Sequence, residues 1–295
     1  MKKINFKILG LILPLFLTSC EKDEVDTSVD VVTLDKVSKT EFDEYLDHYY
    51  TKPYNVRFVY KWDDKSSDHD YQLVPVNYEN AVKMANLVKY LCLDAYQEVA
   101  PKDFLKKYFP KNITLIGSAG YRNNGTMILG LADSGVKITL FDINNLNTNN
   151  VEVLYDRYFR TIYHEFSHIL HQTKDYTKDF RVISEKDYVG DSWNEAWKGS
   201  ESSLSKGFIS DYSSKEPNED FVELIAHYVT FTPQKWDETL EKAGAEGKEK
   251  LQQKIEIVKN YMNTVWKIDL DRLRNEVLGR AENLSNVNLD NTTIQ

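Results

Sequence analysis

The five residues from His164 to His168, with the sequence HEFSH, constrain the fold more than any other stretch. His164 and His168 are four residues apart, so they share a face only if the segment is helical. Two imidazoles on one helical face can bind a single metal ion, and neutral imidazole is a good ligand for zinc. Glu165 lies between them and can act as general base on a water molecule at that metal. The motif therefore requires a helix at the rim of a buried face.

The surrounding sequence predicts such a helix. Asn149 and Asn150 can cap its start. Apolar residues recur at helical spacing from there onward, and the histidines lie beside this stripe. The stripe consists of Val151, Leu154, Tyr155, Tyr158, Phe159, Ile162, Phe166, Ile169 and Leu170. The alternative is a buried helix with two incidentally hydrogen-bonded histidines, but motif and helix together favour a metal site.

Two histidines do not complete a catalytic zinc site, which normally has three protein ligands and a water molecule. We expect one zinc per chain. The candidates for the third ligand are His171, Glu219, Glu223, His227 or an aspartate. His171 follows His168 by three residues, but one helix cannot easily bring three side chains to one tetrahedral ion. Its better role is to support a ligand histidine from behind or to line the cleft. The pattern HExxHxxGxxH is absent, since residue 171 is His and residue 174 is Lys.

A second helix can supply the missing carboxylate. It is predicted from Pro217 over PNEDFVELIAHYVTF, because proline suits the first helical position. Glu219 and Glu223 are one turn apart, on a different face from the apolar stripe. The segment 173–216 between the two helices lacks strong periodicity and is expected to form a wall of the cleft. Trp193 and Trp197 in this segment are candidates for substrate contact, with buried packing expected for at least one of them.

The rest of the chain predicts an α+β fold with a small mixed sheet, the active-site helix and a helical C-terminal part. Ser38 and Glu41 form a candidate capping box for a helix over about 39–50, which TKPYN (51–55) ends. Further helices are expected over 77–99, 101–108, 233–243, 246–266 and 269–282, and strands over 55–62, 113–116, 126–131 and 136–141. An edge strand just before the motif helix could pair with an extended peptide. The polar tail 283–295 is expected to fray.

The N-terminus has the pattern of an export signal. Residues 1–19 carry three lysines and then an apolar run too short to span a bilayer. The run ends in Leu17-Thr18-Ser19-Cys20, which resembles a bacterial lipobox, in which Cys20 becomes the lipidated first residue. An ordinary cleaved signal peptide is the alternative. Residues 20–37 are then an acidic tether from the lipidated Cys20, and residues 38–282 form the domain.

The net charge limits the binding partners that the chain can have, and the cysteine content limits its disulfides. Without the three signal lysines, 34 of the 37 basic residues remain against 46 acidic ones, a net charge of −12. This argues against nucleic acid and against docking on anionic lipid, so the membrane contact would be the lipid anchor itself. Cys92 is then the only cysteine, which excludes an intramolecular disulfide. It lies in a helical apolar pattern and is expected to be buried.

The motifs resemble a known family. HEFSH, followed about fifty residues later by YSSKEPNEDFVE (212–223), looks like the Glu-ligand zincins of lethal-factor type. The resemblance implies that Tyr212 stabilises the oxyanion, that Glu219 is the third zinc ligand and that Glu223 supports a ligand histidine. With the lipobox, the chain is similar to zinc-binding metallopeptidase lipoproteins associated with outer-membrane substrate import. The motifs cover about 161–223; similarity in the helical C-terminal third is only general.

The residues and the resemblance point to the same function. A His₂Glu site from two helices is an open hydrolytic zinc site. We expect a zinc metallopeptidase that hydrolyses peptide or protein substrates, anchored to the bacterial outer membrane by its lipid. The domain is expected at the cell surface, with the periplasmic face as the alternative, and outer-membrane import proteins are implied partners. A non-catalytic zinc-containing accessory lipoprotein is the leading alternative function, and zinc hydrolysis of a non-peptide bond is the other.

Overall fold

The computed structural model describes residues 38–62, 72–121, 127–128, 130–133, 136–199 and 202–294. Residues Lys39–Gln295 form one compact unit. The predicted signal peptide 1–19, the lipidation site Cys20 and the tether 20–37 lie outside the described residues. Within the described part of the chain, no helix is both long and apolar enough to cross a membrane.

The first helix differs from its prediction at both ends. It consists of α1 (Glu41–Leu46), a π-helical turn η1 (Asp47–Thr51) and α2 (Lys52–Tyr54). The capping box predicted at Ser38 was wrong by two residues, because Thr40 and Asp43 cap each other. The helix also continues past residue 51. Pro53 lacks the backbone N–H that an α-helix would use. The helix widens into the π turn just before it, where the Lys52 N–H donates to the Asp47 carbonyl oxygen. Asn55, in the left-handed conformation, ends the helix.

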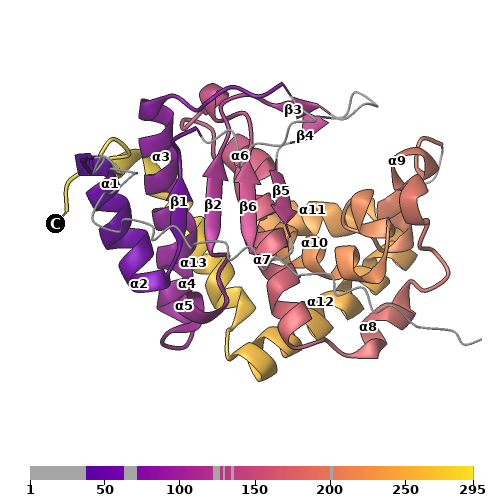
Figure 1. The fold of residues 1–295 in the computed structure, drawn as a ribbon. Helices are drawn as coiled ribbons and strands as arrows, with labels where there is room; N and C mark the ends of the chain where they lie inside the picture. The colour runs from indigo at the N-terminus through magenta and orange to yellow at the C-terminus, as the bar shows by residue number, and fades with distance from the viewer. Residues whose placement is uncertain are drawn as a thin grey trace, which may run out of the picture. The chain divides into compact units, whose positions relative to one another are not determined.

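A four-stranded sheet has the order β1-β2-β6-β5 (Figure 1). Its strands are β1 (Arg57–Val59), β2 (Asn112–Leu115), β6 (Lys137–Leu140) and β5 (Gly130–Asp133). The first three are parallel, with Ile113 opposite Ile138, and β5 is an antiparallel edge. The sheet is therefore mixed, as predicted. Two further strands, β3 (Gly120–Tyr121) and β4 (Met127–Ile128), form a short antiparallel pair.

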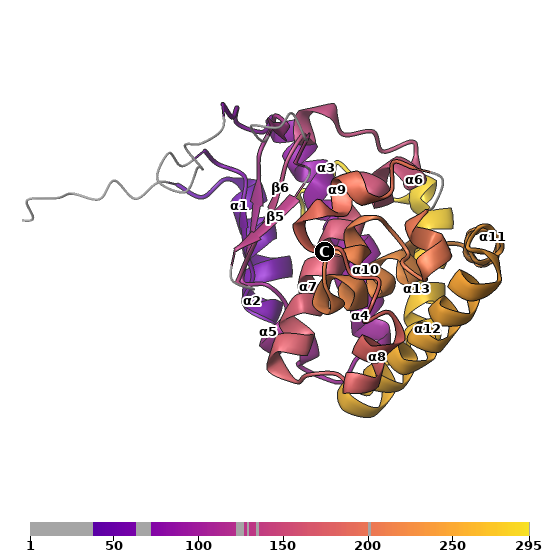
Figure 2. The same cartoon turned by 90° about the vertical axis from the view of Figure 1, so that its right-hand side faces the viewer.

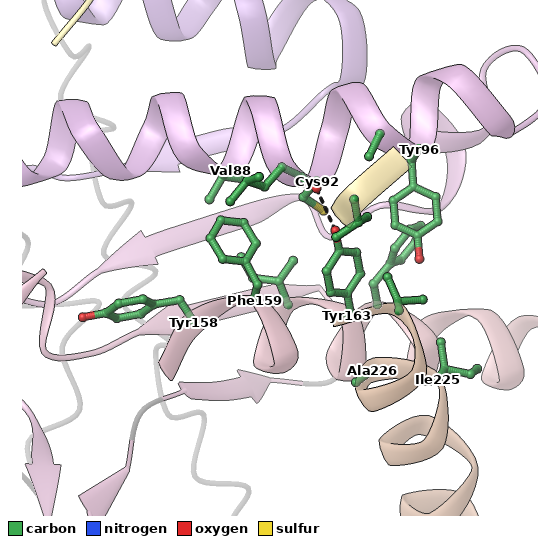
Figure 3. Close-up of a cluster of buried hydrophobic side chains, with 14 of the residues drawn as sticks. Val88, Cys92, Tyr96, Tyr158, Phe159, Tyr163, Ile225 and Ala226 are labelled. Atoms are coloured by element: carbon green, nitrogen blue, oxygen red, sulfur yellow. Dashed lines mark hydrogen bonds between the residues drawn. The ribbon is translucent and has the colours of Figure 1, made fainter. Parts of the chain in front are cut away.

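The helix that carries HEFSH is built as its periodicity predicts. It runs continuously through α6 (Val151–Leu154), the π turn η4 (Tyr155–Phe159) and α7 (Arg160–Thr173), and Asn150 caps it. Its buried face packs on a second helix, made of α3 (Tyr78–Val88), η2 (Lys89–Leu93) and α4 (Asp94–Val99) (Figure 3). The Tyr163 hydroxyl donates to the Leu91 carbonyl oxygen at 2.7 Å. Cys92 is buried in this contact, as expected.

The segment 173–216 contains more helix than its sequence suggested. Two short α-helices, α8 (Lys178–Ile183) and α9 (Trp193–Ala196), lie in it. Three 3₁₀ turns, η5 (Gly190–Ser192), η6 (Ser203–Lys206) and η7 (Tyr212–Ser214), join them to the next helix. Each helical piece has at most six residues, which is too short to show a periodicity.

The C-terminal helices are α10 (Pro217–Thr230), α11 (Pro233–Lys242), α12 (Gly244–Trp266) and α13 (Leu270–Glu282). They match the predicted ranges, and a short helix α5 (Phe104–Tyr108) matches the one predicted over 101–108. The expected frayed tail was wrong. It contains a 3₁₀ turn, η8 (Leu284–Asn286), and Asn86 donates to the carbonyl oxygens of Leu289 and Asn291 at 3.0 Å. A buried asparagine far away in the sequence thus holds the tail.

A buried ion pair attaches the first turn of α10 to α12. Lys254 and Asp220 are 0% and 1% exposed, and their charged atoms are 2.7 Å apart. Lys254 also donates to the Gly207 carbonyl oxygen at 2.6 Å, and the Tyr188 hydroxyl donates to Asp220 at 2.8 Å. Burial raises the pKa of Asp220 and lowers that of Lys254, so each charge depends on the other.

Removing one member of this pair should strongly destabilise the fold. We expect Lys254→Met to lower the free energy of unfolding of the zinc-free protein by about 3–5 kcal/mol, because it leaves a buried carboxylate unpaired. Urea unfolding measures this loss. Lys248→Met on the same helix is the control, since the Lys248–Glu241 pair is exposed and should cost at most about 1 kcal/mol. Equal losses for the two variants would contradict the role of the buried pair.

Candidate metal centre

Three side chains from two packed helices converge on one point. Helices α7 and α10 lie side by side on one side of the sheet (Figure 2). The Nε2 atoms of His164 and His168 are 3.1 Å apart, and each is 3.2 Å from Oε2 of Glu219. In the described part of the chain, these three residues form the one group of histidine, cysteine or acidic side chains close enough to hold a metal ion.

The donor set fits zinc. Tetrahedral ligands at about 2.0–2.1 Å from zinc lie about 3.3 Å from each other, which is close to the three distances observed. Burial alone would lower the pKa of His164, but hydrogen bonds to Glu219 and Glu223 outweigh it and raise the pKa to about 10. The site therefore favours positive charge at the position where the ligand atoms meet.

Glu223 holds His164 from behind. Its Oε1 lies 2.8 Å from Nδ1 of His164, one turn after Glu219 on α10. Its other oxygen, Oε2, accepts a hydrogen bond from the Ser210 hydroxyl at 2.6 Å. The carboxylate thus accepts the Nδ1 proton of His164, so Nε2 is the atom that would bind a metal ion, in place of the proton that Glu219 favours there. The backbone carbonyl oxygen of Glu223 lies 2.9 Å from Nδ1 of His227, so His227 is occupied within its own helix.

His171 occupies the corresponding place behind the second histidine. Its Nε2 atom is 2.9 Å from Nδ1 of His168. Burial lowers the pKa of His171 to about 4, so its ring is neutral and can accept the His168 proton. The His171 ring in turn packs against Tyr176, with ring centroids 5.8 Å apart. The structure therefore places His171 behind His168 rather than at the metal position itself.

Glu165 is next to the metal position but takes no part in binding it. The side chain is partly buried, and burial raises its pKa. Within the described ranges, no side chain hydrogen-bonds to or pairs with its carboxylate. Each of the other two carboxylates, Glu219 and Glu223, has at least two partners. Glu165 is therefore free to accept a proton from a water molecule.

Tyr212 reaches the site but is not free. Its hydroxyl donates to Oε1 of Glu219 at 2.9 Å. The Trp193 ring packs edge-on against Tyr212, with centroids 5.0 Å apart, so Trp193 is beside the site. The Trp197 indole N–H instead donates to the Ser214 hydroxyl at 2.8 Å, and its ring lies near Phe208. Both tryptophans are partly buried. Of the two, Trp193 is the one in contact with a site residue.

Two residues of the site were not predicted from the sequence. Ser210 holds the second oxygen of Glu223, and no sequence pattern marks it. Lys215 has its Nζ 3.9 Å from Oε1 of Glu219 and 5.5 Å from the centroid of the Tyr212 ring. Lys215 precedes Pro217, the first residue of α10, so helical spacing gives no signal for this second contact.

Comparisons with known proteins agree with this geometry. Residues 35–271 match a family described as "putative zinc-binding metallo-peptidase". The chain is also similar to a solved structure described as a "putative zinc-binding metallo-peptidase" from Bacteroides caccae ATCC 43185. That chain is 37% identical, the TM-score is 0.75, and the match covers 85% of the present chain and 95% of the other. No curated protein matches the chain.

Proposed function

Because the chain belongs to the "putative zinc-binding metallo-peptidase" family, we propose that it is a zincin-like, zinc-dependent peptidase that hydrolyses peptide bonds in peptides or proteins. One observation carries the proposal. His164, His168 and Glu219 direct three donor atoms to one point, and the unpaired carboxylate of Glu165 lies beside them. Three protein ligands leave a tetrahedral ion one open position, which is the mark of a catalytic rather than a closed structural site.

The residues divide the chemistry between them. Bound zinc would act as a Lewis acid and lower the pKa of its water to about 7. Glu165 takes a proton from the attacking water and later delivers it to the leaving amine. The Tyr212 hydroxyl donates to the oxyanion that forms on the scissile carbonyl. Glu223 and His171 keep the protons of the two imidazoles on Nδ1, so both Nε2 atoms stay available.

The edge strand β5 suits an extended substrate. It is the last strand of the sheet, it runs antiparallel to β6, and it lies against α7. An edge strand presents backbone N–H and C=O groups on its outer side, so a peptide chain can add to it as a further strand. The scissile bond of a peptide held in this way would lie over the HEFSH helix. Trp193 would contact a neighbouring substrate side chain.

The N-terminus supports a further part of the proposal. Lipidation at Cys20 would attach the domain to the outer membrane through the tether 20–37. The acidic run after Cys20 favours display at the cell surface, close to outer-membrane import proteins as partners. Protease treatment of intact cells tests the location, since a surface domain is digested and a periplasmic one is protected.

Metal removal tests the enzymatic proposal directly. The purified protein should contain one zinc per chain by elemental analysis and should cut members of a peptide library. A chelator should abolish cleavage, and added zinc should restore it, because the proposed reaction needs the zinc ion that the three ligands would hold.

Other results would select the alternatives. Zinc at one per chain with no cleavage of any peptide would indicate a non-catalytic accessory protein. Cleavage of a non-peptide ester alone would indicate a different zinc hydrolase. Peptide cleavage that survives complete zinc removal would contradict a metallopeptidase of any kind.

A further inference from the structure

The single hydroxyl proton of Tyr212 is required for two different hydrogen bonds. A phenol carries a single O–H donor, and the Tyr212 hydroxyl uses it for Oε1 of Glu219 at 2.9 Å. The proposed peptidase needs the same proton at the oxyanion. The hydroxyl must therefore leave Glu219 during each turnover. Without a replacement, Oε1 of a carboxylate that is only 10% exposed would lose its hydrogen bond while Oε2 holds the metal.

Lys215 is placed to replace it. Its Nζ lies 3.9 Å from Oε1 of Glu219, which is an ion-pair distance but beyond a direct hydrogen bond. The same Nζ is 5.5 Å from the centroid of the Tyr212 ring, so it lies alongside the phenol. The two imidazoles instead approach the other oxygen, Oε2, each at 3.2 Å. A lysine has a flexible stem and three rotatable donors, so a shift of about 1 Å completes the bond.

The backbone holds the three residues at a constant spacing. The Lys215 N–H donates to the Tyr212 carbonyl oxygen at 3.0 Å in the turn η7. Pro217 then begins α10, and Glu219 lies in its first turn. Tyr212, Lys215 and Glu219 thus come from one short, well-defined stretch. The Lys254–Asp220 pair fixes the end of that stretch to the core.

We propose that Lys215 is a positioning residue that takes over Oε1 of Glu219 when the Tyr212 hydroxyl turns to the oxyanion. The proposal rests on the peptidase function proposed above. Only hydrogen bonds are exchanged, and no covalent bond or net proton moves between Lys215 and Glu219. Glu219 keeps its orientation toward the metal while the oxyanion gains a donor.

The variant Lys215→Met tests this role, because it keeps the length of the side chain and removes the ammonium group. We expect kcat to fall about tenfold with KM unchanged, as is typical for loss of a partner behind a metal ligand. Lys215→Arg should recover most of the loss. In a Tyr212→Phe background, where no exchange takes place, adding Lys215→Met should not lower kcat further. Lys198→Met is the control, because the exposed Lys198–Glu195 pair is separate from the site.

Zinc affinity supplies a readout that does not depend on activity. An ammonium group near a ligand carboxylate repels a metal cation, so Lys215→Met should bind zinc as tightly as the wild type or more tightly in a chelator competition. A lower zinc affinity would mean that Lys215 is a static support for Glu219. A change confined to KM would mean that it binds substrate, and an additive loss with Tyr212→Phe would mean that no exchange occurs. Each of these three results overturns the proposal and leaves the peptidase assignment intact, whereas a wild-type protein without peptide cleavage would overturn the peptidase assignment.

Discussion

Replacing Glu165 by Gln is expected to lower kcat by about 10²–10⁴-fold, because the amide cannot accept the proton of the attacking water. This corresponds to about 2.7–5.4 kcal/mol of transition-state stabilisation. The substitution keeps size and shape, and Glu165 contributes no atom to the group that holds the metal. Zinc content should therefore stay at one per chain. Peptide cleavage under saturating substrate, together with elemental analysis, measures both quantities.

A control for Glu165 is available on the same continuous helix. Glu152 is exposed and pairs with Lys235 at 2.8 Å, far from the histidines in sequence. Glu152→Gln removes a carboxylate of the same helix and should leave kcat and zinc content at wild-type values. If Glu165→Gln retained near-wild-type cleavage, Glu165 would not be the base. If it lost zinc as well, its effect on turnover would come from the metal centre.

The second large effect is expected at Glu219. Glu219→Ala removes one of the three donors and should weaken zinc binding by more than the roughly 10–100-fold typical of an outer partner. Glu219 is the residue whose Oε2 lies 3.2 Å from both imidazole Nε2 atoms, and two histidines alone do not make a complete site. The protein should then be isolated without zinc and without peptide cleavage. Titration with zinc in competition with a chelator measures the loss of affinity.

Glu223→Ala is the matched comparison, one turn further along α10. Glu223 contacts the far side of His164, so its loss should leave zinc bound at one per chain, with affinity lowered by roughly 10–100-fold. The two variants thus separate a ligand from its support. The reverse result, with zinc lost from Glu223→Ala and kept by Glu219→Ala, would move the third ligand to Glu223.

The helix that carries HEFSH could be predicted from the sequence because the pattern that specifies it is local. The spacing of His164 and His168 and the apolar stripe around them specify a helix and a shared face within about twenty residues. The predictions of the long helices differed from the structure only at the helix ends. TKPYN (51–55) is predicted to end the first helix, but the π turn before Pro53 lets the chain remain helical to Tyr54. The tail was misjudged because Asn86, which holds it, is about 200 residues away.

The residues that contact the ligand side chains from behind were harder to predict from the sequence. His171 was expected either to support a ligand histidine or to line the cleft, and the geometry places it 2.9 Å from His168. Ser210 was missed, since a serine in an irregular segment gives no periodic signal. The dual position of Lys215, between Tyr212 and Glu219, depends on how the turn η7 meets α10. Neither contact follows from residue spacing alone.

The amino-acid sequence by itself determined which helix carries the paired imidazoles and which face they share, because helical periodicity acts within a few residues. Only the tertiary structure decided which carboxylate of α10 meets them. Glu219 and Glu223 differ by one turn, and the packing of α10 on α7 directs the first to the front of His164 and the second to its back. Helix spacing makes both carboxylates available, but only the relative placement of two helices distant in sequence assigns each to its side of the imidazole.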